Sequence, residues 1–281
     1  MAKIHVHQSG EAGIFANAYV VEGQFGVVLV DTTLTFSESA KLRKTVESLR
    51  KPLLGVIVTH AHPDHVAGIS VLVDSEQIPV YAQEGTVRLM RETESAKHAQ
   101  WSPVFREEWI PKWTYPNRIV ADGERIKFKE MVFRVHDMGP GGDCDANSVW
   151  ILENDAKAAF VGDLIFNGTH SFLADGHIRD WLRNLRRLRE LLIEVPAIYP
   201  GHGSPGSFET ILHQKTYLET YCRAVSMISK GSPKLNDTQK ELLTWVMEQY
   251  LPGAGLSFMI ALGADRVAEE LASAADEGAV I

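Results

Sequence analysis

Residues 60–65 read His-Ala-His-Pro-Asp-His, which places three histidines and one aspartate within six positions. Side chains two residues apart on an extended segment point the same way, so His60 and His62 can reach one metal ion. Asp64 and His65 follow where the chain turns into a helix and face a neighbouring position. Imidazole and carboxylate are ligands that suit zinc, and also iron or manganese. The spacing therefore predicts two adjacent divalent metal ions, with zinc as the default.

The types of ligand favour a catalytic centre over a closed structural zinc site. Structural zinc sites are usually rich in cysteine, whereas sites built from His and Asp tend to keep a position open for water. The chain has only two cysteines, Cys144 and Cys222. A disulfide framework is therefore not expected, and a reducing compartment is the default. With no apolar signal segment at the start of the sequence and no run of 18 apolar residues, we expect a cytoplasmic protein without a membrane partner.

Composition narrows the classes of partner. The 281 residues carry 28 basic and 36 acidic side chains, a formal net charge of −8. Such a chain has no general attraction to nucleic acid or anionic lipid, so we expect a small-molecule substrate and no nucleic-acid partner. Hydrophobic residues make up 45% and charged residues 23%, which are proportions of a globular protein and exclude a disordered or fibrous chain.

The elements that must position the cluster alternate along the chain. A buried strand over 55–59 leads directly into the histidines, and open α/β folds bind ligands beyond the carboxyl ends of strands. Thr35 and Glu38 have capping-box spacing and predict the start of a helix. Further strands are expected at 3–8, 16–22, 25–30, 78–82, 118–135, 148–161 and 197–199. Further helices are expected over about 64–73, from 84, over 178–192 and through most of the chain beyond 207.

Residues 96–117 form a polar stretch punctuated by prolines and carrying several aromatic side chains. This composition predicts a loop or short helix that folds over another part of the molecule. The aromatic residues at 101–115 could line a substrate pocket or pack the helical tail onto the first half, and packing is the favoured interpretation.

Over residues 1–207 the chain resembles the metallo-β-lactamase fold superfamily, whose His-x-His-x-Asp-His motif appears here unaltered. Three further markers occur in the family's order. Asp31, in Leu-Val-Asp-Thr, matches an aspartate that supports the metal-binding loop. Asp163, in Phe-Val-Gly-Asp-Leu, matches the aspartate that bridges two metals, and His202, in Tyr-Pro-Gly-His-Gly, matches the final histidine. The resemblance implies an α/β (α+β) fold, a four-layer αββα sandwich over 1–207, followed by a C-terminal helical region over 208–281.

One marker of the family is absent. A third histidine for the first metal usually lies in a Gly-His-Thr context, but residues 139–148 read Gly-Pro-Gly-Gly-Asp-Cys-Asp-Ala-Asn-Ser. Aligning on the Asp145 segment puts Asp143 at that position, whereas aligning on Gly-Pro-Gly puts Gly142 there and leaves the ligand missing. Asp143 is favoured, because a carboxylate is a competent zinc ligand, and Cys144 is the second choice. Alternatively, Asp143 and Asp145 only cap a turn.

The resemblance implies a dinuclear metal hydrolase. In that mechanism a water bridging the metals loses its proton, and the resulting hydroxide attacks an ester, thioester or lactone. Asp64 would also orient the nucleophile or carry its proton. The first metal would be held by His60, His62 and Asp143, the second by Asp64, His65 and His202, with Asp163 as the bridge.

Two other histidines and three other classes of function stay open. His170 and His177 follow the bridging aspartate, so either contacts substrate or serves as a surface or capping residue. The alternatives to a hydrolase are an iron-dependent redox enzyme similar to a sulfur dioxygenase, a non-catalytic binding or regulatory protein on a modified site, and a structural metal protein. Helical tails often form dimer contacts, so a homodimer is one expected assembly.

Overall fold

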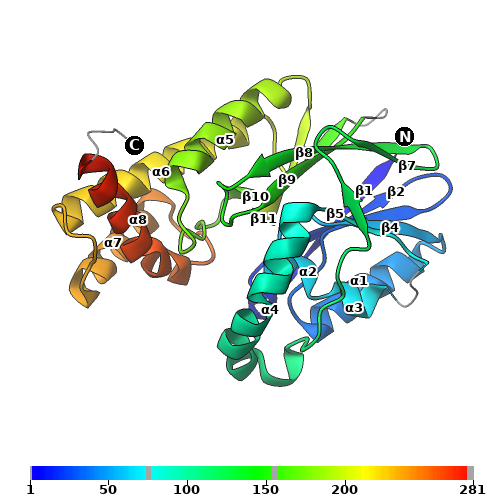
Figure 1. Cartoon of the computed structure of the whole chain (residues 1–281), viewed down its shortest axis with the longest axis horizontal. Helices are drawn as coiled ribbons and strands as arrows, with labels where there is room; N and C mark the ends of the chain where they lie inside the picture. The colour runs from blue at the N-terminus through cyan, green and yellow to red at the C-terminus, as the bar shows by residue number, and fades with distance from the viewer. Residues whose placement is uncertain (1, 74–76, 154–156, 277–281) are drawn as a thin grey trace.

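Two β-sheets lie face to face in the computed structural model, which describes residues 2–73, 77–153 and 157–276 (Figure 1). The first sheet has the order β1-β2-β3-β4-β5-β6. Its strands are β1 (Lys3–Gln8), β2 (Asn17–Glu22), β3 (Val27–Val30), β4 (Leu53–Ile57), β5 (Val80–Gln83) and β6 (Arg118–Val120). Strands β3 to β6 are parallel to one another, so their carboxyl ends meet at one edge of the sheet.

The second sheet has the order β11-β10-β9-β8-β7. Its strands are β7 (Arg125–Phe128), β8 (Met131–Gly139), β9 (Asn147–Leu152), β10 (Ala158–Asn167) and β11 (Ala197–Gly203). Only β10 and β11 pair in parallel, with register shifts on either side of Gly162. The inner faces of both sheets share one apolar core, in which Val30 and Ile57 of the first sheet meet Phe133 and Trp150 of the second.

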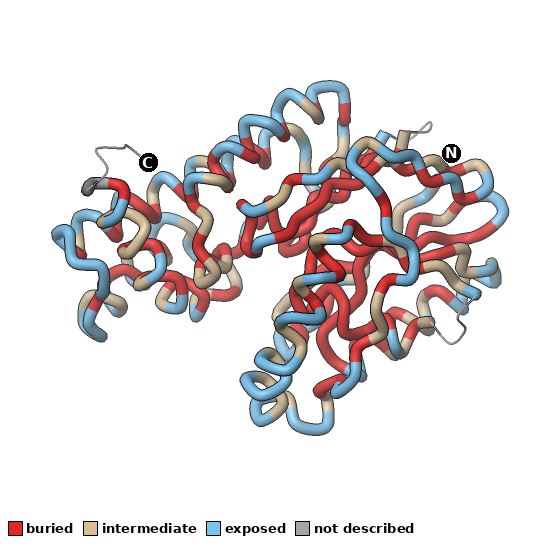
Figure 2. The backbone as a smooth tube through the Cα atoms, viewed as in Figure 1, coloured by how far each residue is buried: buried red, intermediate tan, exposed pale blue. Residues whose placement is uncertain are grey.

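Helices cover the outer face of each sheet, which confirms the predicted αββα sandwich (Figure 1). On the first sheet lie α1 (Phe36–Ser48), the short helices α2 (Pro63–Val66) and α3 (Ile69–Leu72), and α4 (Glu84–Phe105). Thr35 caps α1 as its spacing with Glu38 predicts, since its side chain accepts a hydrogen bond from the Glu38 amide. Figure 2 shows that the buried residues follow the strands and the helix faces turned toward them.

The second sheet is covered by α5 (Ile178–Leu191) and by the helical tail. The tail consists of α6 (Glu209–Ser229), α7 (Asp237–Tyr250) and α8 (Phe258–Asp276). Leu218 of α6 and Ile260 of α8 belong to the same core cluster as Ile165 of β10, so the tail shares a core with the second sheet. No helix among the residues that the structure describes is both long and apolar enough to cross a bilayer.

Residues 96–105 differ from the loop or short helix expected of them. They continue α4 to Phe105, and a 3-10 turn, η2 (Arg106–Glu108), follows. Pro103 lies in the last turn of this helix, so the hydrogen bond that its missing N–H removes falls at the helix end, and the helix stops two residues later. Beyond this helix, Trp109 and Trp113 are buried in the core of the first layer. They do not pack the helical tail onto the first half as expected, because the described residues of that core include none from the tail.

Candidate metal centre

The histidine motif lies just beyond the carboxyl end of β4. The segment after Ile57 stays extended through His62, which precedes Pro63 at the first position of α2. Proline is favoured there because its fixed backbone angle suits a helix start. The rings of His60 and His62 come within 5.3 Å of one another, measured between centroids. The following helical turn then carries Asp64 and His65, both buried.

Asp31 holds two of the motif histidines in orientation. Its Oδ2 accepts a hydrogen bond from Thr59 Oγ1 at 2.7 Å and lies 3.1 Å from His65 Nδ1. Thr59 Oγ1 in turn lies 2.9 Å from His60 Nδ1. Since the threonine proton goes to Asp31, the hydroxyl oxygen accepts the proton on Nδ1 of His60. Both histidines therefore turn Nε2 toward the cluster, and the partners of Nδ1 favour the tautomer in which Nε2 can bind a metal.

Asp163 and His202 come from two paired strands of the second sheet. Gly162 adopts a left-handed backbone (φ 51°) at the register shift in β10, where a side chain would approach Thr59 Oγ1 to 2.6 Å. This bulge re-aims Asp163 toward the motif. Asp163 lies 3.4 Å from His65 Nε2 through Oδ1, and 3.9 Å from His60 Nε2 and 3.3 Å from His202 Nε2 through Oδ2.

The segment that lacks the family's third histidine brings Asp143 into the cluster. Asp143 is buried, with Oδ2 2.6 Å from His62 Nδ1 and Oδ1 3.7 Å from His60 Nε2. Cys144 is turned elsewhere, because its thiol donates to the Ala146 carbonyl at 3.3 Å. Burial, with the neighbouring Asp143, also raises the pKa of that thiol well above its usual range. Of the three residues that the sequence left open, Asp143 is the one with an oxygen facing the histidines.

Unpaired buried atoms test whether this cluster suits a metal. The side chains of His60, His62, Asp143 and Asp163 lie close enough to share one ion, and so do those of Asp64, His65 and His202. Among the described residues, Nε2 of His60, Nε2 of His65, Oδ1 of Asp143 and Oδ1 of Asp163 are buried without a hydrogen-bond partner. Buried polar atoms normally find a partner, so several unpaired atoms that converge on one point indicate a binding site for another group. Divalent cations bound there would satisfy these atoms.

The charges of the cluster also favour a cation. Burial lowers the pKa of His62, but the Asp143 carboxylate outweighs it and raises the pKa to about 10. In the same way, burial of His202 is outweighed by Asp163 and Asp64, which raise its pKa to about 9. Burial dominates at His60 and lowers its pKa well below the usual range. Burial of His65 is likewise outweighed by Asp163 and Asp64, which raise its pKa well above the usual range. The carboxylates thus hold positive charge on His62, His65 and His202 in the protein without metal, where metal cations would replace those protons.

Metal binding is therefore expected to release protons. At pH 7.5 the imidazoles of His62 and His202 are protonated, because their pKa values are about 10 and 9. His65 is protonated as well, because its burial is outweighed by Asp163 and Asp64, which raise its pKa well above the usual range. Each of the three must lose a proton to bind a metal. We expect about three protons released per chain on saturation with zinc, and weaker apparent affinity at lower pH. Calorimetric titration of metal-depleted protein in buffers of different ionisation enthalpy measures the number. Metal binding without proton release would contradict this charge distribution.

Asp175, which the sequence did not point to, supports His62 from the opposite side of the ring. Its Oδ2 lies 3.1 Å from His62 Nε2, leaving Nδ1 turned toward Asp143. The only signal in the sequence is that Asp175 lies between His170 and His177, in the segment after Asp163. A carboxylate behind a metal-binding histidine fixes its ring and raises its basicity.

Asp175→Asn is expected to weaken metal binding at the His60, His62 and Asp143 position by about tenfold or more, because loss of such a partner costs 10- to 100-fold in affinity. Competition with a chelating dye measures the change. The control is Asp145→Asn, which alters a carboxylate in a nearby loop that contacts His177 and none of the clustered side chains in the described contacts. Equal affinities in the two variants would rule out the supporting role.

The structure does not bring His170 or His177 to the cluster. His170 is fully buried, with Nδ1 3.1 Å from the Tyr217 hydroxyl. His177 precedes α5, and its Nε2 lies 2.9 Å from Asp145. Neither lines the cavity described below. A role in substrate contact stays a prediction without support from this geometry.

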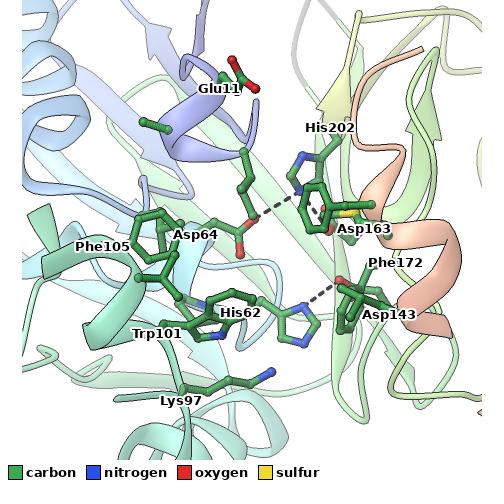
Figure 3. Close-up of a pocket in the computed structure, with 18 residues that line it drawn as sticks. Glu11, His62, Asp64, Lys97, Trp101, Phe105, Asp143, Asp163, Phe172 and His202 are labelled. Atoms are coloured by element: carbon green, nitrogen blue, oxygen red, sulfur yellow. Dashed lines mark hydrogen bonds and ion pairs between the residues drawn. The ribbon is translucent and has the colours of Figure 1, made fainter. Parts of the chain in front are cut away.

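A cavity of about 410 Å³ opens over the cluster, a size typical of small-molecule sites. Figure 3 shows Trp101, Phe105 and Lys97 of α4 on one side of it, with Asp143 and Phe172 opposite. Part of the aromatic stretch therefore lines the pocket, whereas its later members pack the core. The Lys97 ammonium lies 6.0 Å from the centroid of the Phe172 ring and adds a positive charge to an otherwise apolar wall.

An αββα sandwich with buried His and Asp side chains clustered beyond β4 and between its sheets defines a class of metal-binding proteins. Residues 12–202 match the family model of the metallo-beta-lactamase superfamily, and the chain belongs to this superfamily. Its members are mostly metal-dependent hydrolases that bind divalent metals, typically two.

Individual relatives are distant. A beta-lactamase-like protein 2 homolog of Caenorhabditis elegans is 26% identical over 197 residues, which are 66% of this chain but only 55% of the worm protein. A metallo-beta-lactamase type 2 of Bacillus cereus is 24% identical over 73% of each chain. Among solved structures, a protein crystallised in a di-iron-bound form is 26% identical, has a TM-score of 0.60, and covers 76% of this chain and 99% of its own.

Proposed function

We propose that the chain is a hydrolase that uses two divalent metal ions, with zinc as the default, on a small-molecule ester, thioester or lactone. The observation that carries this proposal is the position of Asp163. Its two oxygens lie within 3.9 Å of His60 on one side and within 3.4 Å of His65 and His202 on the other. A carboxylate between two groups of histidines can contact two ions at once, as a dinuclear site requires.

His60, His62 and Asp143 would hold one ion, and Asp64, His65 and His202 the other, with Asp163 shared. When bound, such ions polarise the oxygen of the electrophile and lower the pKa of water at the site. The remaining contributions come from the side chains of the cavity. Its walls are largely apolar, so a bound substrate would displace water from the site and strengthen the electrostatic interactions inside.

Asp64 is placed to orient the attacking water. It lines the cavity, 3.1 Å from His202 Nε2 and 3.3 Å from His65 Nε2. Burial raises the pKa of its carboxyl, but His65 and His202 outweigh this and bring the pKa well below its usual range. The carboxylate therefore stays ionised at neutral pH and acts as a hydrogen-bond acceptor for water in the cavity, which turns a lone pair of that water toward the substrate.

The experiment is metal analysis joined to a substrate screen. Protein purified without added metal is assayed for metals per chain, and for hydrolysis of 4-nitrophenyl acetate, a simple thioester and a γ-lactone. We expect about two ions per chain and turnover that a chelator abolishes and zinc restores. An Asp163→Ala variant should lose both metals and turnover, which separates the site from a contaminating esterase.

A second candidate, iron-dependent redox chemistry, is favoured by one observation, the relative that was crystallised with two irons. The same preparation distinguishes it. Iron as the dominant metal, together with oxygen consumption on a thiol substrate and no hydrolysis, would replace the hydrolase proposal. Absence of both bound metal and turnover would favour a binding or regulatory role.

A further inference from the structure

The cavity over the cluster lies between two helices that are far apart in the sequence. From α4 come Trp101, Val104 and Phe105, and from the start of α8 come Phe258, Met259 and Leu262. The side chains of the cluster, among them Asp64 and Asp163, form its floor. A substrate that reaches Asp64 therefore passes between an apolar surface of the first half and an apolar surface of the helical tail.

The mouth of this cleft exposes large apolar side chains. Val104 is 62% exposed, Phe258 51% and Leu262 49%. Single exposed apolar residues are ordinary, but a group that gathers around one cavity from two elements marks a binding surface. The core does not require them there, because neighbouring residues of the same helix, such as Ile260 and Ala264, are buried and already join α8 to the second sheet.

We infer that the substrate of this site carries an apolar group of several carbons, which is seated between α4 and α8 while its reactive bond lies over the cluster. The inference rests on the proposed function and narrows it to esters, thioesters or lactones with an aliphatic or aromatic substituent. The residues that determine this specificity are Phe105 on α4 and Phe258 and Leu262 on α8.

A small-molecule group is favoured as the occupant because the apolar surface is continuous with the metal cluster in one cavity of about 410 Å³. That volume suits a substituent of a small ligand. Each methylene that moves from water into such a cleft strengthens binding by about fourfold. The expected signature is therefore a steady rise in kcat/KM and in affinity with chain length until the cleft is filled.

The test is a chain-length series on the zinc-loaded protein with two matched variants. The substrates are the 4-nitrophenyl esters of acetate, butyrate and hexanoate. The binding probes are the free carboxylates butyrate, hexanoate and octanoate, whose affinities are measured by calorimetry. Leu262→Ala removes a leucine of the cleft. Leu242→Ala removes a leucine of α7 that is equally exposed, at 48%, but does not line the cavity.

In the wild type we expect kcat/KM and affinity to rise by about fourfold per methylene. In Leu262→Ala the gain per methylene, in kcat/KM and in affinity, should be smaller by at least about twofold. In Leu242→Ala both gains should be unchanged. If no ester is hydrolysed but carboxylate affinity still rises with chain length and Leu262→Ala flattens it, the proposed function fails and the apolar site stands. If esters are hydrolysed with no dependence on chain length, the function stands and the apolar site is overturned. A sedimentation coefficient that falls in Leu262→Ala, with flat series in the wild type, would also overturn it and make the rim a contact between copies of the chain.

Discussion

Replacing Asp143 with alanine is expected to lower the metal content from about two ions per chain to about one and to reduce turnover by more than about a hundredfold. Even a residue that only supports a metal ligand costs 10- to 100-fold when it is lost, so loss of a direct ligand should exceed that range. The reason is geometric. Asp143 is the buried carboxylate within 2.6 Å of His62 and 3.7 Å of His60, and its Oδ1 has no hydrogen-bond partner among the described residues.

The matched control is Asp145→Ala, two residues further along the same loop. Asp145 is mostly exposed, pairs with His177 and does not line the cavity. It should therefore retain the metals and the activity. Asp143→His offers a second comparison, because an imidazole at this position is also a competent ligand and should restore metal binding that the alanine loses. Unchanged metal content in Asp143→Ala would return Asp143 to the role of a turn cap.

Gly201→Ala is expected to disrupt the cluster although the substitution adds a single methyl group. A Cβ at Gly201 would lie 1.7 Å from Asp163 Oδ1 and 3.0 Å from the Gly162 carbonyl carbon. Asp163 or the β10 and β11 pair must then move, and the shared carboxylate leaves its place between the histidines. We expect loss of bound metal and a decrease of about 1–3 kcal/mol in the free energy of unfolding.

The measurements for Gly201→Ala are metal content and urea unfolding, with and without a chelator. Gly85→Ala serves as the control, because Gly85 lies in the first turn of α4 and a Cβ there meets only the Ala146 methyl at an ordinary 3.4 Å. That variant should be as stable as the wild type or slightly more stable, since alanine has a higher helix propensity than glycine. Full metal content in Gly201→Ala would show that the Asp163 carboxylate tolerates displacement and is not the shared ligand.

Much of the cluster could be predicted from the sequence because its members follow short, local rules. The two-residue spacing of His60 and His62 is meaningful only on an extended segment, and the apolar run before it predicts that segment. Asp31 directly follows the apolar strand β3, at the edge where the parallel strands of the first sheet end. The apolar run before Asp163 pointed to that residue as well, although β10 continues past it to Asn167 and the register shift at Gly162 aims its side chain. The fold class follows from the same alternation of strands and helices.

The residue that occupies the position of the family's third histidine could not be identified in the same way. Asp143, Cys144 and Gly142 are adjacent in sequence, and a shift of one residue changes which side chain faces the histidines. The choice depends on how the loop between β8 and β9 is held from outside, for example by Asn184 of α5, whose side chain donates to the Met138, Pro140 and Gly141 carbonyls. Contacts made across about 40 residues leave no local pattern.

By itself, then, the sequence determined the class of the protein and most of its cluster, because motif spacing and strand ends act over a few residues. Only the tertiary structure decided that Asp143 faces His62, that Asp175 supports the same ring, and that α4 and α8 meet over the cavity. It also placed His170 in the core rather than at the cluster. The physical reason is common to all four: each depends on the packing of elements distant in the chain, which is set by the buried surfaces of the whole fold and not by local spacing.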